Sequence, residues 1–285
     1  MTAAIEQMLQ RYACHEPGEY ERALKEIIQE IALVGLWRAH FFERAAFYGG
    51  TSLRILHGLN RFSEDLDFTL FQTDLKFDLS HYHNSLRLEL ESFGFKTEIV
   101  KKEKSSVQSA FIKMNTVQEL LKIGVEEGKI RGVHPQTLLK IKFEIDTDPP
   151  PGATIDVRYL YQPIPCSVKT LILPDSFAGK IHACLCRQWK NRVKGRDWFD
   201  FIWFVGKNTP LNLRYLESRL RQSGGLTNEN LLTPNSTVEM LANKIEQIDI
   251  EKAKQDVLPF IQDKESVAVW SKEFFLSTIE RIQFL

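Results

Sequence analysis

The first two thirds of the chain alternate between two hydrophobic periods, one typical of helices and one typical of strands. Apolar residues recur every three or four positions over residues 19–47 and 81–93, which predicts one or two helices in the first stretch and one in the second. Shorter stretches alternate apolar and polar residues, which predicts strands at residues 65–71, 96–100, 109–114, 138–145, 154–160 and 168–173. This pattern predicts a mixed sheet with helices packed on it.

The last third of the chain has an almost entirely helical pattern. Apolar spacing predicts helices at residues 177–192, 197–205, 213–221, 237–247, 250–260 and 271–283. Pro174 and Asp175 are typical of a helix start. We therefore predict an α/β (α+β) chain of two domains, a mixed sheet with helices at residues 1–174 and a helical bundle at residues 175–285.

Candidate chemistry is concentrated in a glycine turn and in a pair of acidic residues that follows it. Asp65 and Asp67 are two residues apart in a predicted strand, so their side chains point from the same face and can share a divalent metal ion. Gly49 and Gly50 precede a predicted helix at residues 51–57, where backbone amides can bind a phosphate group. The combination indicates a site for metal and triphosphate.

These motifs resemble the AbiEii-type toxin nucleotidyltransferases of the DNA polymerase β-like superfamily in both order and spacing. Gly-Gly-Thr-Ser-Leu-Arg at residues 49–54 is followed by Arg-Phe-Ser-Glu-Asp-Leu-Asp-Phe at residues 61–68, and later by Lys180, Arg187 and Arg-Asp-Trp-Phe-Asp at residues 196–200. Many superfamily members have serine in place of Thr51, but the hydroxyl group is kept. The resemblance implies a polymerase β-like nucleotidyltransferase sheet, an NTP substrate and Mg²⁺ or Mn²⁺ as cofactor.

The resemblance also implies a third acidic ligand, from a strand beside the one that carries Asp65 and Asp67. Glu144 matches this position best and Asp146 is the second choice. Lys140, Lys142, Glu144 and Asp146 share one face of the predicted strand. Simple solvent exposure of that face is the alternative interpretation. We expect Asp65, Asp67 and Glu144 to bind metal.

Four further residues near the two motifs are candidate phosphate ligands or catalytic groups. Thr51 is the predicted triphosphate contact, with Ser52 beside it, although hydroxyl residues at such positions often only cap a helix. Arg61 is a surface charge, a phosphate ligand or a brace for the turn. Asp197 is a helix cap, a partner of Lys180 or, as the resemblance implies, an active-site carboxylate.

Lys180 and Arg187 lie two helical turns apart, so both point along one face of the predicted helix. An ordinary solvated helix has the same pattern. The resemblance implies that Lys180 binds the triphosphate and offsets negative charge as pyrophosphate leaves. We expect Arg187 to assist in phosphate binding.

Composition and charge restrict the setting in which this site works. The chain has a formal net charge of zero, which argues against a protein that coats nucleic acid through bulk electrostatics. Residues 176–196 nevertheless contain no acidic residue and six basic residues, namely Lys180, Arg187, Lys190, Arg192, Lys194 and Arg196. No apolar run is long enough to span a bilayer, and the four cysteines have no disulfide-like spacing. We expect a cytoplasmic protein without a membrane partner.

The predicted function is transfer of a nucleoside monophosphate from an NTP to an acceptor hydroxyl. The resemblance implies a toxin of a toxin–antitoxin or phage-defence system with an antitoxin partner, and some relatives act on the 3′ end of tRNA. The basic run suits an RNA acceptor. Two alternatives remain: an enzyme that modifies a protein, and a nucleotide-binding or RNA-binding module whose catalysis is weak or lost.

Overall fold

In a computed structural model of the chain, the described residues are 3–102, 108–116, 118–119, 134, 136–187, 193–227 and 231–285. The chain divides into two compact units. Unit 1 comprises Met1–Gly58, Phe62–Pro149 and Asp156–Thr170. Unit 2 comprises Leu59–Arg61, Pro150–Ile155 and Leu171–Leu285. The boundary predicted between residues 174 and 175 stays a prediction.

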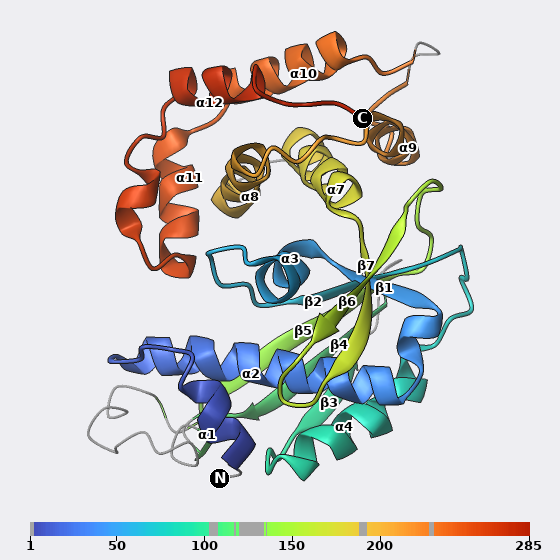
Figure 1. The fold of residues 1–285 in the computed structure, drawn as a ribbon, viewed down its shortest axis with the longest axis vertical. Helices are drawn as coiled ribbons and strands as arrows, with labels where there is room; N and C mark the ends of the chain where they lie inside the picture. Colours follow the sequence, from blue (N-terminus) through green and yellow to red (C-terminus); the bar gives the residue numbers. More distant parts are fainter. Residues whose placement is uncertain are drawn as a thin grey trace. The chain divides into compact units, whose positions relative to one another are not determined.

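Unit 1 is built on a mixed sheet of seven strands with the order β3-β4-β5-β2-β1-β7-β6 (Figure 1). The strands are β1 (Ala45–Tyr48), β2 (Leu66–Leu70), β3 (Glu98–Lys102), β4 (Gln108–Asn115), β5 (Leu138–Asp146), β6 (Ile155–Leu160) and β7 (Cys166–Leu171). Strand β2 is parallel to β5 and antiparallel to β1, which is parallel to β7. Strand β4 is antiparallel to both of its neighbours, β3 and β5. The predicted mixed sheet is confirmed.

The core of unit 1 lies on one face of this sheet. Phe68 of β2 stacks on Phe47 of β1 and Phe143 of β5, with ring centroids 5.1 and 4.6 Å apart. The helix α2 (Pro17–Arg38) contributes its long buried face to the same core. Side chains alternate along a strand, so Asp67 and Glu144, the neighbours of Phe68 and Phe143, point from the opposite face.

The other helices and 3₁₀ turns whose bounds lie within the described residues of unit 1 are short. They are α1 (Ala3–Leu9), α3 (Gly49–His57), α4 (His83–Ser92), and the 3₁₀ turns η1 (Phe41–Glu43) and η2 (Leu79–Tyr82). The prediction of one or two helices over residues 19–47 is wrong at its end, because α2 stops at Arg38 and β1 begins at Ala45. His40 adopts a left-handed conformation with φ 58° and interrupts the helix. Strand β1 has only four residues, too few for the alternation to be recognised in sequence.

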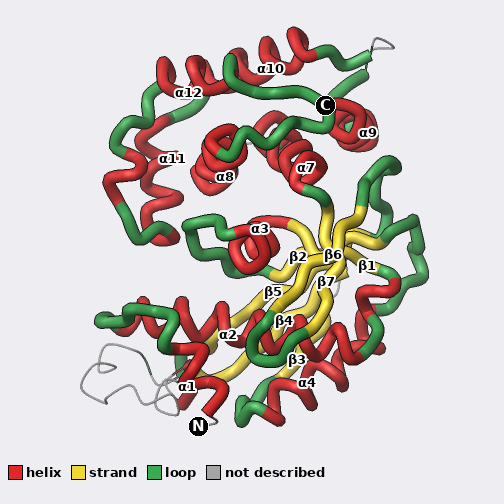
Figure 2. The backbone as a smooth tube through the Cα atoms, viewed as in Figure 1, coloured by secondary structure: helices red, strands yellow, loops and turns green. Residues whose placement is uncertain are grey.

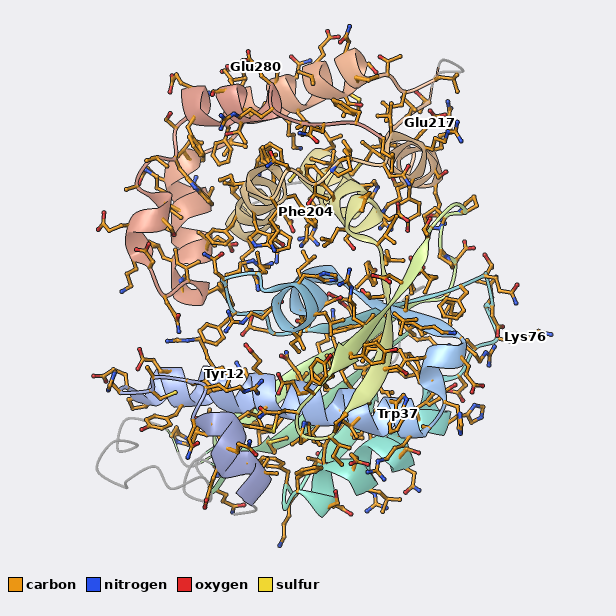
Figure 3. All side chains as sticks on the ribbon, in the orientation of Figure 1. Tyr12, Trp37, Lys76, Phe204, Glu217 and Glu280 are labelled. Atoms are coloured by element: carbon orange, nitrogen blue, oxygen red, sulfur yellow. The ribbon has the colours of Figure 1, made fainter. Side chains whose placement is uncertain are left out.

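Unit 2 is helical, as predicted for the last part of the chain (Figure 2). Its helices are α7 (Leu173–Cys186), α8 (Gly195–Gly206), α9 (Leu213–Gln222), α10 (Pro234–Glu246), α11 (Ile250–Val257) and α12 (Lys272–Ile279), with 3₁₀ turns η3 (Leu258–Phe260) and η4 (Lys264–Val267). Phe204 of α8, labelled in Figure 3, stacks on Phe177 of α7 with centroids 4.8 Å apart. Trp198 packs edge-on against Phe275 of α12 at 5.3 Å. Among the described residues, no helix is long and apolar enough to cross a membrane.

Gly195, the first residue of α8, allows α8 and α11 to approach closely. A Cβ atom at this position would lie 1.8 Å from the carbonyl oxygen of Ala253 in α11. That oxygen belongs to the backbone, so the clash cannot be relieved by a side-chain rotation. The two helices can keep this distance only if residue 195 has no side chain.

Gly195→Ala should therefore force α8 and α11 apart. We expect a loss of about 3 kcal/mol or more in the free energy of unfolding, the upper end of the range for overpacking. Gly206→Ala is the matched control, because a Cβ at Gly206, the last residue of the same helix, would meet nothing within 4 Å. Urea unfolding of both variants measures the difference, and equal losses would contradict the close approach.

Candidate nucleotidyl-transfer site

The glycine turn of unit 1 lies directly against Asp67. Gly49 follows the last residue of β1, and Tyr48 is paired with Asp67 across the antiparallel ladder. Gly49 has a left-handed backbone with φ +81°, and a Cβ atom there would lie 2.5 Å from Oδ2 of Asp67. Position 49 therefore needs glycine for two reasons, its conformation and the carboxylate that lies against it. Gly50, the second glycine, is buried in the first turn of α3.

Thr51 and Ser52 are both buried, and their hydroxyl groups make hydrogen bonds inside unit 1. Thr51 donates to the carbonyl oxygen of Asp65 at 2.5 Å. Ser52 lies 3.0 Å from the hydroxyl of Thr170, which donates to the carbonyl of Phe47 at 2.7 Å. The capping interpretation is wrong, because the N-cap of α3 is Tyr48. Triphosphate binding by Thr51 and Ser52 stays a prediction, and the hydroxyls secure the strands and the loop around the turn.

The acidic residues of unit 1 meet through the pairing of β2 with β5. Asp67 is the direct partner of Glu144 in this parallel ladder, while Asp146 is opposite Thr69. Of the two candidate acidic residues on β5, the register thus places Glu144 nearer to Asp67, and Asp146 lies two residues further along the ladder. Asp65 lies just before β2, which begins at Leu66 and not at residue 65 as predicted.

Lys142 is a neighbour of Glu144 that the sequence interpretation left out of the site. Its Nζ lies 2.5 Å from Oε1 of Glu144, and both side chains are partly buried. Their spacing of two residues in a strand was the signal that could have identified the pair. The described residues contain no group of three His, Cys, Asp or Glu side chains arranged to bind a metal ion.

Unit 2 contains a buried ion cluster around Lys180. Its Nζ lies 2.7 Å from Asp200 and 3.3 Å from Asp197, and these two acidic residues lie one turn apart on α8. Arg61 grips Asp200 through two hydrogen bonds of 2.6 and 2.7 Å, and both side chains are almost inaccessible to solvent. Arg187 bonds Asp197 at 2.7 Å. Among the described residues, three cationic and two anionic side chains make these contacts, an excess of one positive charge.

Electrostatics inside this cluster favour the charged forms of Asp200 and Lys180. Burial acts to raise the pKa of Asp200, but Arg61 and Lys180 outweigh it, so the pKa of Asp200 is lowered. Burial acts to lower the pKa of Lys180, but Asp200 and Asp197 outweigh it, so the pKa of Lys180 is raised. Asp200 and Lys180 are therefore both ionised at neutral pH.

The cluster brings together Lys180, Arg187 and Asp197, three of the predicted site residues, and also Arg61. Arg61 is buried and bonds Asp200, so it is not a surface charge, while bracing of the turn and phosphate binding by Arg61 stay predictions. Asp197 is a partner of Lys180 and also of Arg187. Asp200 was not predicted as a site residue, although its spacing of three from Asp197 places both on one helical face. Phosphate binding by the cationic residues stays a prediction.

The run without acidic residues at 176–196 is less basic in the structure than it is in the sequence. Lys180 and Arg187 have acidic partners from α8. Arg196 lies 3.8 Å from Asp256 and stacks over Phe260. The acidic partners of this run come from α8 and α11, which follow it in the chain. The positions of Lys190 and Arg192 lie outside the described residues.

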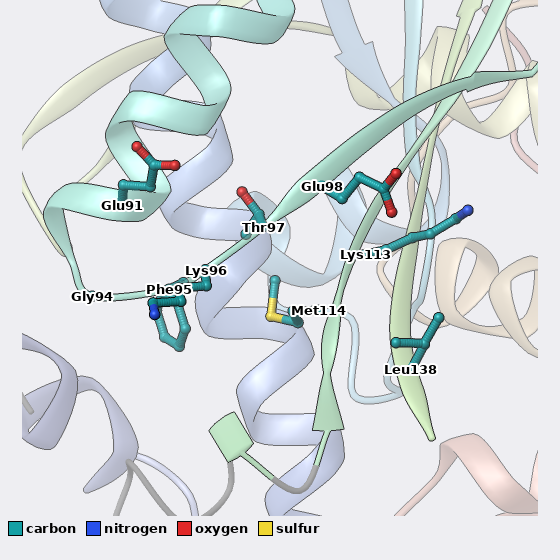
Figure 4. Close-up of a pocket in the computed structure, with 9 residues that line it drawn as sticks. All are labelled: Glu91, Gly94, Phe95, Lys96, Thr97, Glu98, Lys113, Met114 and Leu138. Carbon is teal, nitrogen blue, oxygen red and sulfur yellow. The ribbon is translucent and has the colours of Figure 1, made fainter. Parts of the chain in front are cut away.

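A separate pocket in unit 1 contains none of the predicted site residues (Figure 4). Its volume is about 710 Å³, and it lies where the end of α4 meets β3, β4 and β5. Phe95 and Met114 line it together with the charged residues Glu91, Lys96, Glu98 and Lys113. The acidic residues of the candidate site are therefore not part of this pocket.

The family described as nucleotidyl transferase AbiEii toxin, type IV TA system, matches residues 31–277. The chain belongs to the AbiEii family. AbiEii membership makes it a nucleotidyltransferase toxin of a type IV toxin–antitoxin system, and it implies an NTP substrate and an antitoxin partner. The resemblance found in the motifs is confirmed.

Two solved structures from Helicobacter pylori are similar to this AbiEii chain. One is described as a candidate nucleotidyltransferase; it has 19% sequence identity and a TM-score of 0.45, over 89% of this chain and 94% of the other. The second is JHP933, with 18% identity and a TM-score of 0.46, over 91% of this chain and 94% of the other. No curated protein sequence matches the chain significantly.

Gly49→Ala tests the contact between the glycine turn and Asp67. Gly58→Ala is the matched control, because Gly58 has φ +75° but a Cβ there would meet nothing within 4 Å. The control should lose about 1 kcal/mol in the free energy of unfolding, the cost of a left-handed non-glycine residue. Gly49→Ala should lose about 1–3 kcal/mol more, because it also displaces Asp67. Equal losses in urea unfolding would show that residue 49 needs glycine for its conformation alone.

Asp200→Asn tests the buried ion cluster. Removing one charge of a buried pair should cost about 3–5 kcal/mol in the free energy of unfolding at pH 7. The pKa of Asp200 is lowered by folding, so its contribution is present above its unfolded pKa of about 3.9 and is lost as the pH falls below that value. The difference between wild type and variant should therefore be constant from about pH 6 to 8 and shrink below about pH 4.

The control for this experiment is Asp249→Asn. Asp249 is the N-cap of α11 with a largely exposed side chain, and asparagine caps equally well. We expect this variant to lose far less free energy of unfolding than Asp200→Asn at pH 7, and this small loss should also shrink at acid pH, because hydrogen bonds with Lys252 lower the pKa of Asp249. A difference between wild type and Asp200→Asn that does not depend on pH would contradict the ionised cluster.

Proposed function

We propose that this AbiEii toxin is a metal-dependent nucleotidyltransferase that modifies RNA, with the 3′ end of tRNA as the proposed acceptor. An acceptor hydroxyl attacks the α-phosphorus of the NTP, the bond from that phosphorus to the bridging oxygen of the β-phosphate breaks, and pyrophosphate leaves. The acceptor proton passes to solvent or to a nearby carboxylate. In such a reaction the protein acts chiefly by positioning and charge stabilisation.

The observation that supports this proposal best is the contact of Asp67 with the backbone of Gly49. The turn begins α3, whose first amides have no partner within the helix and favour an anion. Phosphate bound at these amides would lie beside the Asp67 carboxylate, and two negative groups this close require a cation between them. Glu144, paired with Asp67, adds a second carboxylate on the same face.

We propose that Asp65, Asp67 and Glu144 hold Mg²⁺ or Mn²⁺ together with the phosphates of the NTP. The residues fit such an ion as a shared site: Mg²⁺ commonly takes one or two carboxylates and completes its coordination with phosphate and water. The Asp67 carboxylate lies so close to Gly49 that a Cβ atom at residue 49 would clash with it, and this closeness to the turn supports the role of Asp67. When bound, the metal supplies charge neutralisation on the phosphates and a lower pKa for the attacking hydroxyl.

The other site residues have different support. Thr51 secures the Asp65 carbonyl, and with Gly50 it lies in the first turn of α3, where phosphate would bind. Triphosphate binding by Lys180 and Arg187, and a catalytic role of Asp197, rest on the family resemblance and on the excess of positive charge among the described side chains of their cluster. The RNA acceptor rests on the resemblance as well, because part of the basic run is neutralised by acidic partners.

The test is a labelling experiment with each α-³²P-labelled NTP, Mg²⁺ or Mn²⁺, and total tRNA or candidate proteins as acceptors. Label on RNA should appear with wild type and fall at least about 100-fold with Asp67→Asn, the scale of removing one charge-stabilising group from an active site. Glu144→Gln should have a comparable effect. Asp146→Asn should retain most activity, because Asp146 lies opposite Thr69 and not opposite Asp67.

Each other outcome has a defined meaning. Label on a protein that depends on Asp67 would establish the protein-modifying alternative. NTP binding without any labelled acceptor would favour the binding module. Equal loss in Asp146→Asn and Glu144→Gln would mean that the third carboxylate is not determined by the β2–β5 register.

A further inference from the structure

The segment that leads into β2 lies outside any helix or strand, and side chains from two helices hold its carbonyl groups. Gln29 of α2 is fully buried, and its Nε2 lies 3.2 Å from the carbonyl oxygen of Ser63 and 2.9 Å from that of Glu64. The next carbonyl, that of Asp65, accepts the hydroxyl of Thr51 from α3. Three consecutive carbonyl groups, the last of them that of Asp65, are thus held just before β2, the strand that carries Asp67.

A glutamine side chain is suited to this arrangement because its amide nitrogen carries two hydrogens. One nitrogen can therefore donate to two neighbouring carbonyl oxygens at once. A carboxylate at the same position could only accept hydrogen bonds, and an apolar side chain would leave both carbonyls without this donor. Buried carbonyl groups without a donor destabilise the conformation that holds them.

A second side chain on the same face of α2 contacts this loop. Lys25 lies one turn before Gln29, and its Nζ is 3.4 Å from Oε1 of Glu64. Lys25 is also bonded to Glu21 at 3.2 Å. Residues one turn apart on α2 thus hold both the backbone and the side chain of the loop.

We propose that Gln29 is a positioning residue that sets the path of residues 63–65 and thereby aims Asp65 and Asp67 at the nucleotide. The inference rests on the proposed function, since Asp65 and Asp67 matter for catalysis only if they hold the metal and the phosphates. Gln29 itself lies 34 and 35 positions before the carbonyls it bonds and touches them through its side chain alone. Its effect on the reaction is therefore indirect.

The test compares Gln29→Met with Gln108→Met by hydrogen–deuterium exchange and by transfer kinetics. Gln108 of β4 is a matched control: its side-chain amide also bonds loop backbone, donating to the carbonyl of Phe77 and accepting from the amide of Leu79 at 3.0 Å. Methionine keeps the length of the side chain but removes the amide in both variants. Each variant loses two hydrogen bonds between a side-chain amide and loop backbone, but only Gln29→Met loses them at the proposed site.

Gln29→Met should exchange amide hydrogens faster in the peptide that spans residues 62–67, while Gln108→Met should exchange faster around residues 77–79 only. In Gln29→Met, kcat should fall about 10- to 100-fold with KM for the NTP changed by less than about threefold, since positioning acts on the transition state more than on binding. Gln108→Met should retain the kcat of wild type. A structural role alone would affect the two variants equally.

Unchanged exchange in Gln29→Met would overturn the proposal, and so would faster exchange with unchanged kcat. If Gln29→Met does not fold, Gln29→Asn replaces it, because the shorter amide cannot reach both carbonyls; the same two results then decide. If wild type transfers no nucleotide to any acceptor, the proposed function fails and with it the positioning role. The exchange data would then show separately whether Gln29 orders the loop.

Discussion

The close contact between the Asp67 carboxylate and the backbone of Gly49 is the constraint on which the candidate site depends. It leaves no room for a side chain at residue 49, and it requires a left-handed turn where β1 passes into α3. The pairing of Tyr48 with Asp67 brings the two together, and the pairing of Asp67 with Glu144 adds the next strand. The pairing of β1 with β2 and of β2 with β5 therefore brings together the Asp67 carboxylate, the first amides of α3 and the Glu144 carboxylate.

Unit 2 depends on a different interaction, the pairing of charged groups that are buried inside its helical core. Taking a carboxylate such as that of Asp200 out of water is expensive, and only close partners with good geometry offset that cost. Arg61 and Lys180 supply such partners on two sides, which keeps Asp200 ionised. Removal of Asp200 would take a carboxylate partner from both Arg61 and Lys180, so these three side chains behave as one element of the structure.

The same cluster shows how a charge pattern in sequence differs from a charge pattern in space. Residues 176–196 contain no acid, but α8 and α11 supply Asp197, Asp200 and Asp256 as partners. Electrostatic interactions depend on distance and on burial, and neither is a function of position along the chain. An inference about an RNA-binding surface therefore needs the folded partners of each basic residue as well as the run itself.

The sequence by itself determined the family, the mixed sheet, the helical last part and the two motifs, because hydrophobic periods and short motifs are local properties of the chain. It did not show β1, because four residues are too few to display a period, nor the interruption of α2 at His40. Only the tertiary structure decided the register that pairs Asp67 with Glu144, and the bond of Arg61 to Asp200, 139 residues apart. Those contacts depend on which distant segments pack together, and that is a property of the whole fold.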